Sequence, residues 1–407
     1  MKVEKNHIIN ILDKIAEWSI YTIIFTLPFA KSIVEIFIAI AILSLLVKKV
    51  LARERLLVNT HVEILLYLFL IASLVSIFNT QASQMGLSVK AIFSKAFKFA
   101  ALFLITKEII NTREKLKNFV IISALSCVII LIDCFTQYYV THVDFLHNYP
   151  AFLYVANMPS VRGVPTASFP FQNDFAGWIL VFIFPAFCLA FFMKRSLLKN
   201  TLPASIFIGL LYALILTRVR GAWIGFAVSF VILSIVKLKK IGWILLLIIM
   251  VAGAVYSRGN ILSMQSINDR SVMWKNSVTI FMRHPVIGNG LNTFYDNYMK
   301  VRQDDMKNKH GSYAHNCYLQ MAAEIGLLGL FSFLAFVISV MIKSFRALAT
   351  IKDPFYYSLA LGINLGLIAF LIHSAGDTDL YSLPLAALFW LSSGILLATI
   401  KISGLDA

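Results

Sequence analysis

Two arginines stand in a very short polar segment between two strongly apolar stretches of the chain. Arg218 and Arg220 lie between the apolar runs 203–217 and 222–236. A guanidinium group is planar and permanently charged, and it binds phosphate oxygens through two parallel hydrogen bonds. The pair therefore indicates either a site for an anionic ligand or side chains that extend to lipid headgroup phosphates.

A histidine lies directly before another apolar stretch. His315 belongs to the segment Ser312–Asn316, which leads into an apolar run that begins near Cys317. The first turn of a helix favours the neutral imidazole, which accepts a proton, so His315 is a candidate general base. A structural role for a lone histidine remains the alternative. Glu324, further along the same run, needs a partner or a water-filled cavity if the run crosses a membrane.

Three more titratable residues lie close together between the last two apolar runs. His373, Asp377 and Asp379 share the segment 373–379, where they are suited to orient a base or to bind sugar hydroxyls. The triplet Asp377-Thr378-Asp379 also resembles the DxD pattern of metal-dependent glycosyltransferases. A match of this length is weak, and a capping or ion-pair role explains it equally well.

Two further arginines are candidates to contact a ligand. Arg162 precedes the apolar run 174–193. Arg270 follows Asn268-Asp269, a pair that can cap a helix, so it is predicted in the first turn of that helix. A cation there is disfavoured by the helix dipole unless an anion is near.

The elements that position these residues must belong to a membrane protein. Of the 407 residues, 59% are hydrophobic and only 14% are charged, and the mean hydropathy is +0.81. A helix that crosses the bilayer needs about 20 apolar residues. Twelve apolar runs are predicted as transmembrane helices: 18–30, 32–47, 63–78, 91–106, 119–136, 174–193, 203–217, 222–236, 241–256, 317–342, 356–373 and 383–400.

The basic residues orient this predicted bundle. More than half of the 36 Lys and Arg residues fall at the N-terminus and in alternate short loops, which are therefore predicted to be cytoplasmic, as are both termini. Lys90, Lys95 and Lys98 break this pattern and indicate an interfacial stretch. Because the cations form small separate clusters and not one basic face, nucleic acid is not expected as a partner.

The opposite, external side receives five connections. They are 79–90, 137–173, 218–221, 257–316 and 374–382. The longest contains two amphipathic runs: Trp274, Val278 and Phe281 lie at helical spacing before His284-Pro285, and a second run spans 291–301. We therefore expect an all-α polytopic membrane protein that forms a single transmembrane domain over 1–407, with 257–316 as a helical cap between spans nine and ten.

The N-terminal segment and the cysteines give no sign of signal-peptide cleavage, disulfide bonds or metal binding. Lysines precede the first apolar run without a small-residue cleavage site, which predicts a retained anchor and not a removed signal peptide. The four cysteines show no CxxC and no metal-ligand spacing. We therefore expect no disulfide, no metal site and no other cofactor.

Several short motifs resemble the bacterial O-antigen ligase family, which shares a domain with O-antigen polymerases and related membrane oligosaccharide transferases. The motifs occur in a specific order and spacing between about 160 and 380, while the first five apolar runs match only in hydropathy. They are Arg220-Gly221-Ala222-Trp223, Arg270 with Trp274, His284-Pro285-Val286-Ile287-Gly288-Asn289-Gly290, His315-Asn316-Cys317-Tyr318-Leu319-Gln320 and Glu324-Ile325-Gly326-Leu327-Leu328-Gly329-Leu330.

The resemblance implies a twelve-helix protein like the GT-C glycosyltransferases, located in the bacterial inner membrane with its active site facing the periplasm. The implied reaction transfers a glycan from undecaprenyl diphosphate to a hydroxyl of the lipid A core, with inversion and without a metal. The implied partners are that lipid-linked donor, the lipid A core acceptor and membrane lipids.

The family's essential histidine corresponds to His315, and its two diphosphate-binding arginines to Arg220 and Arg270, with Arg218 as the alternative to the first. The other candidates remain predictions for contact with substrate or for support of the site. They are Arg162, Asp377, Asp379, His373 and Glu324.

Other functions fit parts of the pattern. An O-antigen polymerase would use the same donor and extend a second lipid-linked glycan, and a protein-glycosylating ligase is a further possibility. A solute transporter would also have about twelve spans and intramembrane charges, but the two halves of the chain show no corresponding pair of Gly- or Pro-broken segments. A purely structural protein leaves the charges at the external edge without a ligand.

Overall fold

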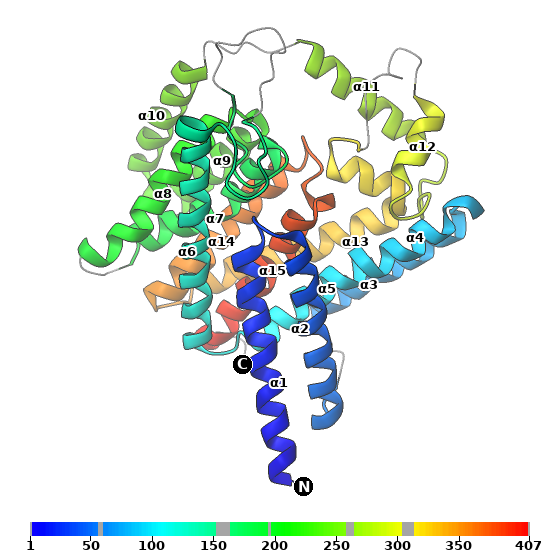
Figure 1. The fold of residues 1–407 in the computed structure, drawn as a ribbon, viewed down its shortest axis with the longest axis horizontal. Coiled ribbons are helices and arrows are strands. Elements are labelled where there is room, and N and C mark those ends of the chain that lie inside the picture. The colour runs from blue at the N-terminus through cyan, green and yellow to red at the C-terminus, as the bar shows by residue number, and fades with distance from the viewer. Residues whose placement is uncertain are drawn as a thin grey trace.

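The computed structural model describes residues 2–55, 60–151, 163–193, 197–257, 264–302 and 313–405, which fold almost entirely into helices (Figure 1). A β-bridge joins Val143 and Pro150. The α-helices are α1 (Lys2–Thr26), α2 (Lys31–Ala52), α3 (His61–Val75), α4 (Met85–Ala91), α5 (Lys98–Ile109), α6 (Arg113–Thr136), α7 (Gln172–Phe191), α8 (Leu197–Thr217), α9 (Arg220–Leu233), α10 (Lys240–Ser257), α11 (Met264–Phe281), α12 (Phe294–Val301), α13 (Cys317–Leu348), α14 (Pro354–His373) and α15 (Leu383–Ile400).

Eight helical segments among the described residues are long and apolar enough to cross a membrane. They are His61–Asn79, Arg113–Thr141, Gln172–Phe191, Asn200–Thr217, Arg220–Leu238, Cys317–Leu348, Pro354–His373 and Leu383–Gly404. The other four predicted apolar runs lie on α1, α2, the stretch from α4 to α5, and α10. The protein is therefore a helical polytopic membrane protein, whereas the count of twelve spans remains a prediction.

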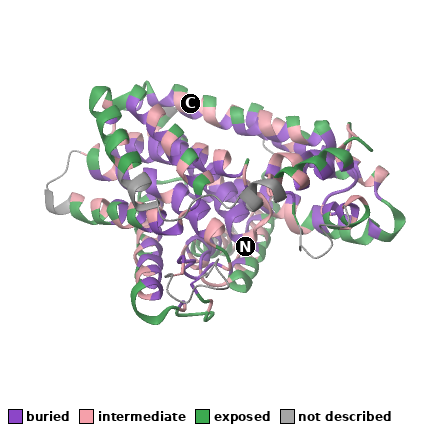
Figure 2. Ribbon diagram, turned by 90° about the horizontal axis from the view of Figure 1, so that it is seen from above, coloured by how far each residue is buried: buried purple, intermediate pink, exposed green. Residues whose placement is uncertain are grey.

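The centre of the bundle is formed by α14 and α15, the most enclosed of these helices. Helix α14 packs against α7 and α9, and α15 packs against α5. Both helices are apolar on every face, as expected of helices surrounded by other helices. Figure 2 shows the same distribution, with buried residues in the middle of the bundle and exposed ones along its outer faces.

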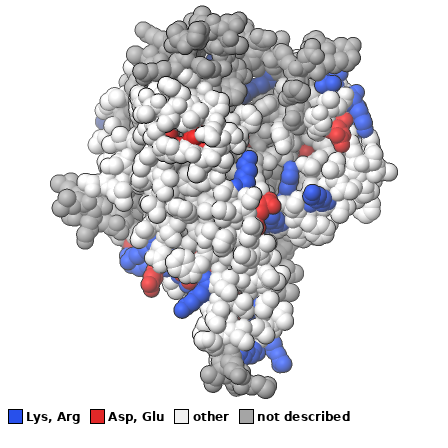
Figure 3. Space-filling view, in the orientation of Figure 1, with Lys and Arg blue, Asp and Glu red and all other residues white. Residues whose placement is uncertain are grey.

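The outer surface suits a lipid environment. Large apolar side chains such as Phe78, Ile224 and Leu247 are exposed. In Figure 3 most of the visible face is uncharged, and Lys, Arg, Asp and Glu occur in small separate groups. A continuous apolar exterior around satisfied helical backbones is what the hydrocarbon core of a bilayer requires.

Ion pairs join the loops that the sequence places on the cytoplasmic side. Lys48 contacts Asp13 and Lys49 contacts Glu108, each at 2.7 Å between charged atoms. Arg113, before α6, contacts Asp353, before α14, at 2.8 Å. These loops therefore lie together at one end of the bundle, the end to which the N-terminus of α1 extends at the bottom of Figure 1.

Two of the three lysines that break the charge pattern have partners within the protein. Lys98 forms an ion pair with Glu35 at 2.7 Å. Lys95 donates a hydrogen bond of 2.6 Å to Oδ1 of Asn292, which lies just before α12. The stretch between α4 and α5 thus connects to the predicted external cap, so protein contacts account for these two cations.

Helix α13 is broken at Gly326, whose backbone (φ 67°, ψ −172°) is not helical. The freed backbone groups pair with the loop His284–Gly290: Leu327 N–H donates to Pro285 O at 2.8 Å, and Gly290 N–H donates to Glu324 O at 2.9 Å. Only glycine adopts this conformation readily. A Cβ on Gly326 would also collide with the carbonyl of Val286.

The two amphipathic runs of the loop 257–316 form α11 and α12, as predicted. The predicted start of the first one was wrong, because α11 begins at Met264 and Asn268-Asp269 lie within it. Arg270 is therefore one turn further into the helix than expected. The argument from the helix dipole does not apply to it, since that effect is confined to the first turn.

Candidate functional site

Residues from the five connections predicted to be external meet at the other end of the bundle. Asp377 contacts both His315 and Asn173, which link three of the loops. Asn79 donates to Gly288 O at 3.2 Å, which adds a fourth. Gly221 lies against His373, which adds the fifth. In Figure 1 this end lies opposite the N-terminus, with α11 and α12 above the bundle.

The start of α13 holds His315 in place. The Asn316 side chain caps the helix by accepting hydrogen bonds of 3.0 Å from the N–H groups of Tyr318 and Leu319. The backbone N–H of Cys317 is shared between the carbonyls of Ser374, at 2.9 Å, and Asp377, at 3.1 Å. The residue before the cap, His315, has φ 48°, and this turn sets its ring beside the 373–379 segment.

The ring of His315 contacts the carboxylate of Asp377. Nδ1 of His315 and Oδ1 of Asp377 are 3.3 Å apart, and the histidine side chain is 37% exposed. A carboxylate next to Nδ1 favours the tautomer that carries its proton there. Nε2 is then the unprotonated nitrogen, and the exposed fraction of the ring makes it accessible to a ligand. Trp274, on α11, contacts the same residue through its indole N–H and the His315 carbonyl, at 3.4 Å.

The two carboxyl groups of the 373–379 segment have opposite protonation preferences. Burial alone would raise the pKa of Asp377, but the hydrogen bond and the charge of His315, with the charge of His373, hold it below its usual value. Burial raises the pKa of Asp379 well above its usual value, and the negative charge of Asp377 adds to this. Asp377 is therefore ionised at neutral pH, whereas Asp379 keeps its proton to a higher pH than an ordinary aspartate does.

His373 is a buried neighbour of this pair, whereas the side chain of His315 is partly exposed. His373 is 2% exposed, its Nε2 lies 3.3 Å from Asn173 O and 3.7 Å from Oδ1 of Asp379, and Ser374 donates to the other oxygen of Asp379 at 2.8 Å. A Cβ on Gly221 would stand 2.9 Å from Nδ1 of His373. The residue thus packs the first turn of α9 against the 373–379 segment.

This packing places the first turn of α9 beside His373. Arg220 is the first residue of α9 and is exposed, whereas Arg218 has φ 56°, lies outside the helix and is half-buried. An arginine at the first helical residue adds its charge to the free backbone N–H groups, and both attract anions. Nη1 of Arg270 would lie 3.7 Å from a Cβ on Gly376, so its guanidinium also reaches the 373–379 segment.

The structure therefore brings most of the predicted residues together. Arg270, His315, His373, Asp377 and Asp379 surround one segment, and Arg220 lies next to it. Glu324 is separate: it lies on α13 beside Gln320, in a cavity next to α12. Arg162 lies outside the described residues.

One contributor was not predicted. Asn173 donates through its side-chain amide to Oδ2 of Asp377, and its carbonyl lies beside His373. The sequence showed it only as part of the polar start of the run 174–193. No local pattern separates an asparagine that holds a carboxylate from one that caps a helix.

Comparison with known families agrees with the motifs. Residues 204–334 match the family model described as O-antigen ligase. This segment belongs to the O-antigen ligase family. The match contains Arg218, Arg220, Arg270, His315 and Glu324, and it ends before the 373–379 segment. No curated protein matches the chain.

The similarity of residues 204–334 to the O-antigen ligase family indicates a general function. The family implies a membrane ligase activity of the O-antigen ligase and polymerase type, which acts on lipid-linked glycans and lipid acceptors. The resemblance drawn from the motifs is confirmed at this level. The matched residues end within α13, so Asp377 and Asn173 join the site through the fold and not through the matched segment.

Proposed function

We propose that the protein transfers a glycan from undecaprenyl diphosphate to a sugar hydroxyl of the lipid A core, at the periplasmic face of the inner membrane. The observation that carries the proposal is the contact of His315 with ionised Asp377, 3.3 Å apart, beside the first turn of α9 and its Arg220. This transfer requires a base for the acceptor hydroxyl and positive charge for the leaving diphosphate.

The acceptor hydroxyl supplies the nucleophile. Its oxygen forms a bond to the anomeric carbon of the donor sugar as the bond from that carbon to the diphosphate oxygen breaks, which inverts the configuration. Nε2 of His315 takes the hydroxyl proton, and Asp377 stabilises the resulting imidazolium through Nδ1. Undecaprenyl diphosphate leaves with the electron pair of the broken bond, and no metal ion takes part.

The leaving diphosphate is a weak base and needs charge stabilisation more than a proton. Arg220 supplies a guanidinium at the first residue of α9, where backbone N–H groups already favour an anion. Arg270 brings a second guanidinium to the same segment from α11. Cations positioned where negative charge develops contribute to the rate without having to reorganise.

The proposal is tested by the product that the purified protein forms. The protein, reconstituted in lipid nanodiscs, is given a labelled undecaprenyl-diphosphate glycan with lipid A core, with a second lipid-linked glycan, or with a peptide. We expect label on the lipid A core. Label on the second lipid-linked glycan would make the protein a polymerase, and label on the peptide a protein ligase.

Two histidine variants complete this test. His315→Ala should lower the rate of transfer by about 10²–10⁴-fold, the usual contribution of a general base, while the protein remains folded. His61 is the first residue of α3 and is exposed at the end of the bundle that is predicted to be cytoplasmic. His61→Ala should therefore leave the rate unchanged. Full transfer by His315→Ala would remove the proposed mechanism.

A further inference from the structure

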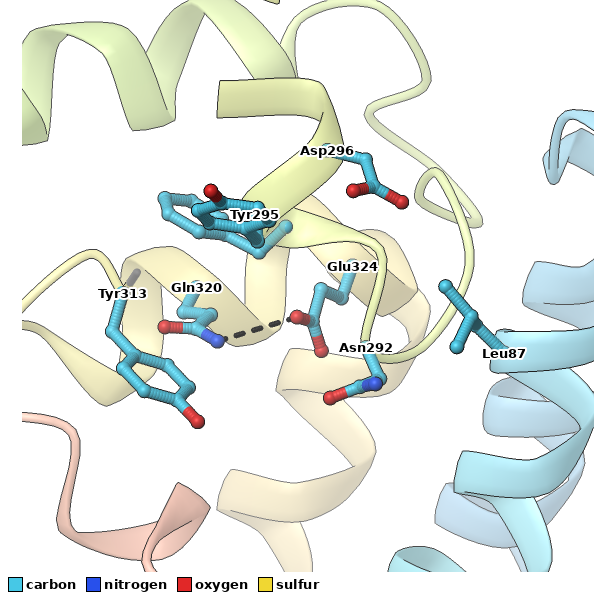
Figure 4. Close-up of a pocket in the computed structure, with 8 residues that line it drawn as sticks. Leu87, Asn292, Tyr295, Asp296, Tyr313, Gln320 and Glu324 are labelled. Carbon is cyan, nitrogen blue, oxygen red and sulfur yellow. Dashed lines mark hydrogen bonds between the residues drawn. The ribbon is translucent and has the colours of Figure 1, made fainter. Parts of the chain in front are cut away.

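A polar cavity lies between α4, α12 and α13, beside the segment that carries His315. Its volume is about 280 Å³, and Figure 4 shows the side chains that surround it. The lining consists of Leu87, Asn292, Phe294, Tyr295, Asp296, Tyr313, Gln320 and Glu324. Leu87 and Tyr295 are about half exposed, so the cavity opens to the outside of the protein.

Glu324 has a free acceptor in this cavity. The residue is 1% exposed, and its Oε1 accepts a hydrogen bond of 3.3 Å from Nε2 of Gln320. Oε2 has no hydrogen bond of good geometry within the part of the chain that the structure describes, although the backbone N–H groups of Asn292 and Phe294 and the hydroxyl of Tyr381 lie near this carboxyl. In Figure 4 the Glu324 carboxyl points toward Asn292 and the open space. A buried carboxyl oxygen without a donor is costly, so a ligand that supplies a donor would be stabilised here.

The lining selects the type of ligand. Two carboxyl groups, two side-chain amides and two tyrosines line the space. Lys95 is not part of the lining, but it donates to Asn292 and its charge attracts Glu324, so Asp296 is the carboxyl group of the lining without that cation beside it. Carboxylates repel phosphate. Toward a hydroxyl group, a carboxylate accepts a hydrogen bond, and a side-chain amide can accept one or donate one. Aromatic rings add apolar surface for the faces of a ring-shaped ligand. The lining is therefore suited to an uncharged sugar and not to the diphosphate.

The cavity is connected to the candidate base by a short path along the chain. Tyr313 lines it, and Ala314 N–H donates a hydrogen bond of 3.1 Å to Oε1 of Gln320. His315, the next residue, faces Asp377 on the other side of the same segment. The 313–315 segment thus lies between a sugar-type cavity and the 373–379 segment that the guanidinium of Arg270 approaches, as two substrates of one transfer would require.

We propose that this cavity binds the acceptor sugar, with the free oxygen of Glu324 accepting a hydrogen bond from one of its hydroxyls. The inference rests on the proposed function, to which it adds the place of the acceptor. The donor's diphosphate occupies the opposite side of the 313–315 segment. For transfer, the acceptor extends from the cavity past the 313–315 segment and brings a hydroxyl to His315.

Binding of the acceptor is measured without the donor. The probe is the free core oligosaccharide released from lipid A, titrated into the purified full-length protein by calorimetry. Glu324→Gln keeps the shape of the side chain but loses the carboxylate, and it should raise the Kd about tenfold or more. Leu87→Trp should do the same by filling the cavity mouth. Val89→Trp, on the same helix but not part of the lining, is the matched control and should bind like wild type.

Transfer kinetics separate this inference from the proposed function. Glu324→Gln should raise the KM for lipid A core about tenfold while the KM for the lipid-linked donor changes less than about threefold. A rise in the donor KM alone would assign the cavity to the donor glycan and overturn the inference. So would unchanged oligosaccharide binding in both Glu324→Gln and Leu87→Trp, even if His315→Ala abolishes transfer. Conversely, a fully active His315→Ala that still binds the oligosaccharide would remove the proposed mechanism and leave the cavity assignment in place.

Discussion

At the scale of single residues, the feature with the most chemical content is the difference between two neighbouring carboxyl groups. Asp377 contacts His315 and has a lowered pKa, whereas Asp379 is buried behind it and has a raised pKa. One group keeps a negative charge for the histidine, and the other keeps its proton to a higher pH and holds the backbone turn through Ser374. Replacement of Asp377 by asparagine should therefore affect catalysis, and replacement of Asp379 should affect stability.

Asp377→Asn should lower kcat by roughly 10²–10⁴-fold, because the neutral amide no longer fixes the tautomer of His315 or stabilises the imidazolium. The KM for the donor should change less than about threefold, since Asp377 orients the base and does not hold the diphosphate. Steady-state kinetics with labelled donor measure both. An equal loss in kcat and in donor affinity would indicate general disruption of the site and not loss of a positioning residue.

Asp379→Asn should retain transfer and should stabilise the protein increasingly as the pH rises. The folded protein holds a proton on Asp379 that the unfolded chain has released above its ordinary pKa, so this group lowers stability as pH rises toward the folded-state pKa. The asparagine removes that dependence, which amounts to at most about 1.4 kcal/mol per pH unit. Thermal unfolding at about pH 5 and about pH 8 measures it. A stability difference from wild type that does not vary with pH would contradict this assignment.

The two arginines at the start of α9 differ in position, and their variants should differ in effect. Arg220→Ala should raise the KM for the donor about tenfold or more, because a charge-assisted contact to phosphate is lost at the helix start. Arg218→Ala, two residues earlier and outside the helix, should change it less than about threefold. The reverse order would move the diphosphate to Arg218 and change the correspondence with the family.

At the scale of elements, the break in α13 connects the cap to the bundle. The loop His284–Gly290 pairs with both sides of Gly326, so two separate motifs form one hydrogen-bonded unit. Asn289 adds two side-chain bonds, to Ile280 O at 3.0 Å and to Ala323 O at 2.9 Å. This unit fixes the first turns of α13, which carry Gln320 and Glu324, relative to α11 and α12.

Gly326→Ala should destabilise the protein by about 1–3 kcal/mol from the backbone conformation alone, and further through the collision with Val286 O. Gly86→Ala is the control: no atom lies within 4 Å of its added Cβ, and α4 should keep its stability within about 0.5 kcal/mol. Thermal unfolding in detergent compares the two. Equal melting temperatures would show that the break does not depend on glycine.

At the scale of the whole molecule, the two ends of the bundle differ in chemistry. One end carries ion pairs between lysines or arginines and acids, such as Lys49 with Glu108. The other gathers the histidine, the arginines of the candidate site and the sugar-type cavity. By the positive-inside rule the first end is cytoplasmic, and we expect the second to face the periplasm.

Cysteine labelling tests this orientation and the span formed by α10. Lys240→Cys, at the start of α10, and Met282→Cys, after α11, are both exposed, and the four native cysteines are buried. In intact spheroplasts a membrane-impermeant maleimide should label Met282→Cys at once and Lys240→Cys only after the membrane is opened. Simultaneous labelling of both would mean that α10 does not cross the bilayer.

The sequence predicted what depends on local composition and missed what depends on distant contacts. All twelve apolar runs lie on helices because hydropathy is a local property. The start of α11 was misplaced, because Asn268-Asp269 resembles a cap although tertiary structure continues the helix to Met264. The contact of His315 with Asp377 joins residues 62 positions apart, and that of Asn173 with Asp377 joins residues 204 apart. A single sequence contains no information on such pairs.

The hydrogen-bonded unit at the break of α13 has a consequence for how this protein has been able to change. A Cβ on Gly288 would collide with the backbone of Glu324, and a Cβ on Gly326 would collide with the backbone of Val286. Neither glycine can therefore be replaced by a residue with a side chain unless the two segments move apart. Mutations in one segment should survive only when the other compensates. We expect the two segments to be inherited as one block among related proteins, while the cavity lining beside them is free to diversify with the sugar that each lineage uses.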